Sequence, residues 1–129
     1  MMSCAVDEIS TESMKIMTSC SDNILEIDFF GEFTLDFPFM KLEVFFSRMH
    51  EECINNKLKN VNISSKDRHF INSESVKLLK KWIEKIMALE DHKKYTLTLF
   101  IHSSSAWQQI NFSTLKSLSP GIVKVYEML

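Results

Sequence analysis

Ser73 stands where a polar loop gives way to the apolar repeat of a helix, a position that suits a phosphate. The first turn of a helix leaves backbone N–H groups free, and the helix dipole makes that end positive. A phosphate on Ser73 would be stabilised there, with Lys66, Arg68 and Lys77 as nearby cations. The simpler interpretation is an N-cap, in which the Ser73 hydroxyl accepts a hydrogen bond from one of the free N–H groups. On these residues alone the cap ranks first.

The four histidines are too scattered along the chain to predict a metal site or a catalytic triad. His50 falls within a helical segment and His92 within a polar turn, and we expect both on the surface. His102 follows directly after a strand, and sites in open α/β sheets often form at strand ends. A small enzyme or ligand binder that uses His102 is therefore an alternative, although no Ser-His-Asp or Cys-His pairing accompanies it.

The cysteines and glycines exclude two further kinds of site. Structural zinc usually takes closely spaced pairs of ligands, and the three cysteines show no such spacing. Two glycines are too few for a glycine-rich loop that cradles nucleotide phosphates. We expect reduced thiols, no metal and no cofactor.

The composition is that of an ordinary globular domain. The 129 residues carry 15 Lys and Arg against 17 Asp and Glu, and this formal charge of −2 argues against nucleic acid as a partner. No apolar run approaches the ~20 residues of a transmembrane helix. Met1 to Thr18 shows no cationic start followed by a hydrophobic block, so no secretory signal is visible. We expect a cytoplasmic protein without a membrane contact.

Two periodicities alternate along the chain and predict the elements that position these residues. Alternating apolar residues predict strands, and apolar residues three or four apart predict helices. Met1 to Glu12 is polar and aperiodic, and we expect a flexible tail over residues 1–12 before a single domain over residues 13–129. The expected strands are Met14–Ser19, Ile24–Phe33, Leu58–Ser64, Tyr95–Ile101 and Ile122–Met128, and the expected helices lie within Asp36–Asn56, Ser73–Glu90 and Ser105–Leu118.

The resulting order, β-β-α-β-α-β-α-β, predicts an α/β fold in which helices pack on a mixed sheet. The second helix is expected to bury one apolar stripe, formed by Val76, Leu79, Ile83, Ile86 and Met87. Seven phenylalanines crowd between positions 29 and 46, and Phe29 and Phe30 must point to opposite faces of their strand. Part of this cluster is a candidate hydrophobic patch for a protein partner.

The segment from Phe70 to Leu79 resembles the signature of the STAS domain, the fold of bacterial anti-sigma factor antagonists. That signature runs as an aromatic and an apolar residue, Asp, Ser, Ser or Thr, Gly, an apolar residue, Gly and two apolar residues. The order of elements also matches, as does Gly31-Glu32-Phe33 at the end of the second strand. The resemblance covers about residues 13 to 129, and the order of elements supports it more strongly than the motif.

In this family a partner kinase, which also acts as the anti-sigma factor, phosphorylates the first serine of the signature, and a phosphatase resets it. The resemblance places that serine at Ser73, with Ser75 as the second candidate. Asn72 replaces the acidic residue of the signature, Glu74 replaces its second hydroxyl, and Ser75 and Lys77 replace glycines. We expect the final helix of the family to be absent, which would uncover part of the sheet and favour a homodimer or a larger partner surface.

The resemblance implies a regulatory protein-binding module and not an enzyme. The implied partners are a regulatory protein such as an anti-sigma factor or serine kinase, and a phosphatase. The expected contact surface is the loop and helix start around the signature, with one tryptophan at its rim: Arg68, His69, Asn72, Glu74, Lys77, Lys81 and Trp107. A constitutive scaffold or dimer subunit, in which the switch has been lost, is the main alternative.

Overall fold

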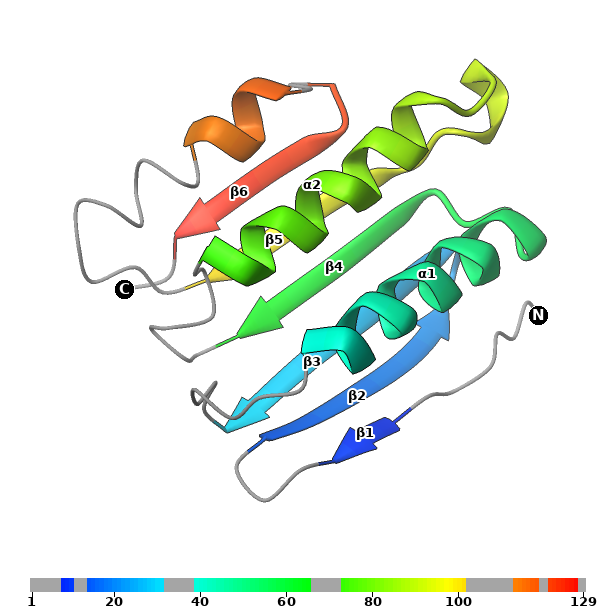
Figure 1. Cartoon of the computed structure of the whole chain (residues 1–129). Helices are drawn as coiled ribbons and strands as arrows, with labels where there is room; N and C mark the ends of the chain where they lie inside the picture. The colour runs from blue at the N-terminus through cyan, green and yellow to red at the C-terminus, as the bar shows by residue number, and fades with distance from the viewer. Residues whose placement is uncertain are drawn as a thin grey trace.

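Six strands form one mixed sheet whose spatial order follows their order in the chain (Figure 1). The computed structural model describes residues 8–10, 14–31, 39–65, 73–101, 113–118 and 121–127. The strands are β1 (Glu8–Ser10), β2 (Met14–Ser21), β3 (Ile24–Gly31), β4 (Asn60–Ser65), β5 (Thr96–Ile101) and β6 (Val123–Glu127). β1, β2 and β3 pair antiparallel, whereas β3, β4, β5 and β6 pair parallel.

Two long helices lie side by side on one face of this sheet (Figure 1). They are α1 (Phe39–Asn55), which follows β3, and α2 (Ser73–Met87), which follows β4. A 3-10 helix, η1 (Asp91–Lys93), leads toward β5, and residues 113–118 form a further helical segment on the same face. Because β3 and β4 are parallel, α1 and α2 both begin at the carboxyl-terminal edge of the sheet. The predicted mixed sheet with helices packed on it is confirmed.

A two-residue turn, Asp22 and Asn23, joins β2 to β3 and fixes their register. Both residues have positive φ angles, 52° and 67°. A tight hairpin loop needs φ above zero at both positions, and aspartate and asparagine tolerate this conformation better than other non-glycine residues. Ser21 and Ile24 consequently pair across the turn, as the predicted hairpin requires.

The core lies between the sheet and the helices. The register sets one buried apolar residue from each of four strands side by side: Leu25, Val61, Leu97 and Val123. Phe29 is buried on the same face, whereas its neighbour Phe30 is exposed on the other, as strand alternation predicts.

The last turn of α1 closes in a Schellman motif. The Leu58 backbone N–H donates to the Cys53 carbonyl at 3.0 Å, and that of Lys57 donates to the Ile54 carbonyl at 3.3 Å. Lys57 takes the left-handed conformation, with φ of 53°, that glycine usually occupies at this position. Leu58 is buried, so the motif anchors the chain as it turns from α1 toward β4.

Two segments differ from their predictions. Residues 8–10 lie in the stretch expected to be a flexible tail, yet they pair with β2 as the edge strand β1. Three residues are too few to display a period of two, so the sequence carries no signal for this strand.

Met87, expected within the buried stripe of α2, is 44% exposed, while Leu78 and Trp82 are buried. The stripe is rotated toward α1 because α2 packs against α1 as well as against the sheet.

The opposite face of the sheet carries polar side chains, and no helix of the described residues lies on it (Figure 1). Hydrogen bonds tie these side chains across neighbouring strands. The Asn62 amide donates to Glu26 Oε1 at 3.0 Å, and the Ser64 hydroxyl donates to Asp28 Oδ1 at 2.5 Å. This face, with Phe30 at its margin, is called the open face below.

Candidate functional site

The first turn of α2 contains the two serines that the sequence singles out. Ser73 opens the helix, at the carboxyl-terminal edge of the sheet. Ser75 is fully buried, so a kinase would reach its hydroxyl only if this turn opened. Glu74 between them is exposed. Ser73 stands at the end of α2 where free backbone N–H groups favour anions.

A row of three lysines follows along the exposed side of α2. The row consists of Lys77, Lys81 and Lys85. Because they are four residues apart, they lie on successive turns of the same side of the helix. The Lys77 ammonium lies 3.7 Å from a carboxylate oxygen of Glu74. The side chains of this ion pair are more than half exposed, so it contributes little to stability and its charges stay available to a partner.

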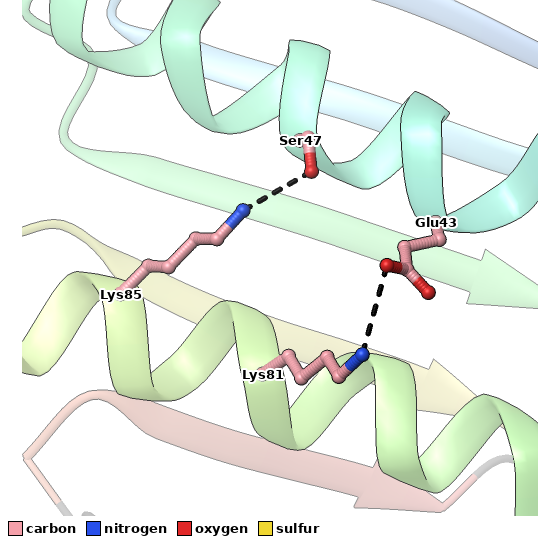
Figure 2. A network of polar contacts seen from close by, with 4 residues as sticks. All are labelled: Glu43, Ser47, Lys81 and Lys85. Atoms are coloured by element: carbon pink, nitrogen blue, oxygen red, sulfur yellow. Dashed lines mark hydrogen bonds and ion pairs between the residues drawn. The ribbon is translucent and has the colours of Figure 1, made fainter.

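The other two lysines reach across to α1 (Figure 2). Lys81 Nζ lies 3.6 Å from Glu43 Oε1, and Lys85 Nζ donates to the Ser47 hydroxyl at 3.1 Å. Glu43 and Ser47 are themselves one turn apart on α1. The two helices are thus linked at two successive turns by polar contacts that solvent can reach.

These contacts border a groove between α1 and α2. Its volume is about 500 Å³, and it is lined by Glu43, Phe46, Ser47, Leu78, Lys81, Trp82, Glu84, Lys85 and Ala88. The rings of Phe46 and Trp82 form its floor, with centroids 5.0 Å apart, but both side chains are almost completely buried. The groove therefore combines an apolar lining with charged and polar side chains contributed by both helices.

A buried polar cluster adjoins Trp82, one of the residues that line the groove. Tyr95 accepts a hydrogen bond from Trp82 Nε1 at 2.6 Å, and its hydroxyl forms a second hydrogen bond with His50 Nδ1 at 2.5 Å. Burial lowers the pKa of His50, the charge of Lys85 lowers it further, and Glu51 opposes both effects. Burial also raises the pKa of Tyr95.

The prediction that His50 lies on the surface is wrong. His50 sits four residues after Phe46 and three before Cys53, on the buried stripe of α1. That spacing was visible in the sequence, and it could have identified the histidine as a core residue. The bond to Tyr95 joins residues 45 positions apart and follows only from the packing of α1 against β5.

The predicted contact residues are only partly covered by the structure. Glu74, Lys77 and Lys81 are brought together on the exposed side of α2, and Glu43 of α1 joins them without having been predicted. Four predicted contact residues and the alternative site residue lie outside the described residues: Arg68, His69, Asn72, Trp107 and His102.

Two other kinds of feature are absent from the described residues. Within the described ranges, no group of three or more His, Cys, Asp or Glu side chains is placed to hold a metal ion. Over those same ranges, none of the helices has the length and apolar character needed to cross a membrane.

Two solved structures share this fold. The crystal structure of an anti-sigma factor antagonist from Mycobacterium paratuberculosis aligns with 94% of this chain and 92% of its own, at 16% sequence identity and a TM-score of 0.61. The protein TM1081, solved by NMR, aligns with 86% of this chain and 79% of its own, at 14% identity and a TM-score of 0.55. No protein-family model and no curated protein matches the sequence. The fold is STAS-like, as the resemblance in the sequence predicts.

Proposed function

We propose that this chain is a cytoplasmic regulatory module that binds another protein through the start of α2. The observation that carries the proposal is the exposed lysine row of α2, with Glu74, on a fold shared with an anti-sigma factor antagonist. The partner class proposed is a regulatory protein such as an anti-sigma factor or serine kinase. In this function the domain is a binding surface and a substrate, and the chemistry belongs to its partners.

The proposed switch is phosphorylation of Ser73, reversed by a phosphatase. A phosphate carries about −1.5 to −2 charges at neutral pH. At the start of α2 it would attract Lys77 away from Glu74 and change the charge of the surface that the partner contacts. We expect Ser73→Asp to weaken partner binding while the fold stays intact.

A constitutive dimer subunit or scaffold is the second candidate. The open face supports it, because large apolar side chains are exposed there on three strands: Met17, Phe30 and Tyr126. A second copy could cover these side chains without any use of Ser73. This candidate predicts that charge reversal on α2 leaves binding unchanged.

Affinity capture from the native host, quantified by mass spectrometry, tests the contact surface. The wild-type chain is compared with Lys77→Glu/Lys81→Glu and with Lys124→Glu, a control at an exposed lysine of β6 on the open face. A protein captured by the wild type and the control, but lost with the double variant, supports the proposal. Equal capture by all three chains would contradict it.

Intact-mass spectrometry of the natively purified protein, with peptide mapping around Ser73, tests the switch. A phosphate on Ser73 supports it. An unmodified Ser73 under several growth conditions, together with a partner that depends on Lys77 and Lys81, would assign the surface to the constitutive module.

A further inference from the structure

Two large apolar side chains are exposed one turn apart on α1. Met40 is 84% exposed and Val44 is 60% exposed, whereas Leu42, Phe45 and Phe46 on the same helix are buried. Neither exposed side chain contributes to the core, and valine is a weak helix former. Adjacent exposed apolar side chains on a helix form a typical anchor point for a partner.

This apolar pair lies beside the lysine row of α2. Glu43 sits between Met40 and Val44 in the chain, and its carboxylate contacts Lys81 at 3.6 Å (Figure 2). Both helices begin at the carboxyl-terminal edge of the sheet, so the first half of α1 lies alongside the first half of α2. The pair and the lysines are therefore parts of one surface, at the end of the molecule where Ser73 opens α2.

This surface is positive although the chain as a whole is negative. Residues 39–48 and 73–81 carry five exposed cations, Lys41, Arg48, Lys77, Lys80 and Lys81, against two exposed carboxylates, Glu43 and Glu74. The surplus is three positive charges, compared with −2 for the whole chain. By helical spacing, Lys41 and Arg48 flank the apolar pair on the side away from α2, and the α2 lysines flank it on the other.

From this arrangement we infer that the partner presents an amphipathic helix whose apolar face packs on Met40 and Val44 and whose flanking Asp and Glu side chains meet the lysines. The inference rests on the proposed function and names the chemistry of its partner. An apolar centre with a ring of complementary charge is the usual anatomy of such contacts. A phosphate on Ser73 would cancel most of the local positive surplus, which explains how the switch would release an acidic partner.

The test uses two synthetic amphipathic peptides with leucines in a helical stripe, one flanked by glutamates and the other by lysines. Each is titrated into the isotope-labelled chain and followed by NMR. We expect the acidic peptide to shift the amide signals of residues 39–48 and 74–85 and the basic peptide to leave them unchanged. Met40→Gln/Val44→Gln should weaken the acidic peptide about tenfold or more, which is ~1.4 kcal/mol. Met87→Gln, at an exposed methionine in the last turn of α2, should bind within about twofold of the wild type.

Three results would overturn the inference. They are equal binding of both peptides, unchanged binding to Met40→Gln/Val44→Gln, and a dimer in solution that this double variant converts to a monomer. The last result would assign the surface to a second copy of the chain. A native partner whose binding needs Lys77 and Lys81 but not Met40 and Val44 would also overturn this inference. The proposed function would still stand in that case.

Discussion

The Tyr95 hydroxyl and Nδ1 of His50 form a hydrogen bond across 2.5 Å in the core. Tyr95 comes from the approach to β5 and His50 from the last turns of α1, so the contact fastens one end of that helix to the sheet. Trp82 of α2 donates to the same hydroxyl. One phenol oxygen thus joins α1, α2 and the sheet next to the groove that carries the proposed contact surface.

The lowered pKa of His50 makes stability depend on pH. In the unfolded chain a histidine binds its proton near pH 6.5, whereas the folded chain resists protonation of His50 down to a lower pH. Protons therefore favour the unfolded state as pH falls below 6.5, and the stability that His50 contributes is present above that pH and lost below it. We expect urea unfolding at pH 5.5 to give a lower free energy of unfolding than at pH 7.5, by at most about 1.4 kcal/mol per pH unit for this one group.

The control for this prediction is a second histidine. His50→Gln should show a weaker dependence on pH in this range, whereas His92→Gln, at an exposed position beside Glu90, should behave like the wild type. The same pH dependence in His50→Gln and the wild type would show that another group is responsible.

Removal of the Tyr95 hydroxyl should destabilise the fold. Tyr95→Phe keeps the ring but leaves Trp82 Nε1 and His50 Nδ1 without their shared partner. Buried polar groups left unpaired cost about 1–3 kcal/mol, which urea unfolding at pH 7.5 would detect. Tyr126→Phe is the matched control, because Tyr126 is about half exposed and stacks on Phe100 through its ring alone. We expect that variant to change stability by less than ~0.5 kcal/mol.

Tyr95→Phe should also change how the free energy of unfolding depends on pH above pH 10. Burial raises the pKa of Tyr95, so the unfolded chain ionises this tyrosine from about pH 10 while the folded chain does not. The wild type should therefore lose stability above pH 10 more steeply than Tyr95→Phe. Parallel curves for the two proteins would count against a buried, neutral Tyr95.

Much of the fold followed from two periodicities in the sequence, but contacts between elements did not. Alternation predicted that Phe29 and Phe30 point to opposite faces of their strand, and this is confirmed, since Phe29 is buried and Phe30 is exposed. The bridge between Glu43 and Lys81 depends on how α1 packs against α2, which the spacing within each helix does not specify. The exposed side of α2 could be predicted because it depends only on the spacing of residues within that helix. The contact with Glu43 of α1 could not, because it depends on tertiary packing.

The burial of His50 differs from these contacts because the sequence did contain a signal for it. Its spacing from Phe46 and Cys53 places it on the buried stripe of α1, whereas the residue type alone favours an exposed or intermediate position. A polar residue on an apolar stripe needs a partner within reach, and the partner, Tyr95, is distant in the chain.

Lys57→Gly should stabilise the protein. Lys57 holds the left-handed conformation at the end of α1, which costs a residue with a side chain roughly 1–2 kcal/mol and costs glycine almost nothing. The greater freedom of glycine in the unfolded chain offsets part of this gain, so we expect a net increase of about 0.5–1 kcal/mol in the free energy of unfolding. Lys59→Gly, at an exposed lysine without a positive φ, should be neutral or destabilising. A loss of stability in Lys57→Gly would show that the lysine makes a contact that outweighs its backbone cost.

The two serines of the first turn of α2 should respond in opposite ways to a negative charge. Ser73→Asp places a carboxylate in the first turn of the helix, where it meets the positive end of the dipole, so stability should be unchanged or higher by a few tenths of a kcal/mol. Ser75→Asp forces a carboxylate into a fully buried position, which should cost several kcal/mol or prevent folding. Circular dichroism with urea unfolding measures both, and Ser75→Ala separates the effect of charge from the loss of the hydroxyl. A stable Ser75→Asp variant would mean that this turn opens readily, and Ser75 would then rank with Ser73 as a site for a kinase.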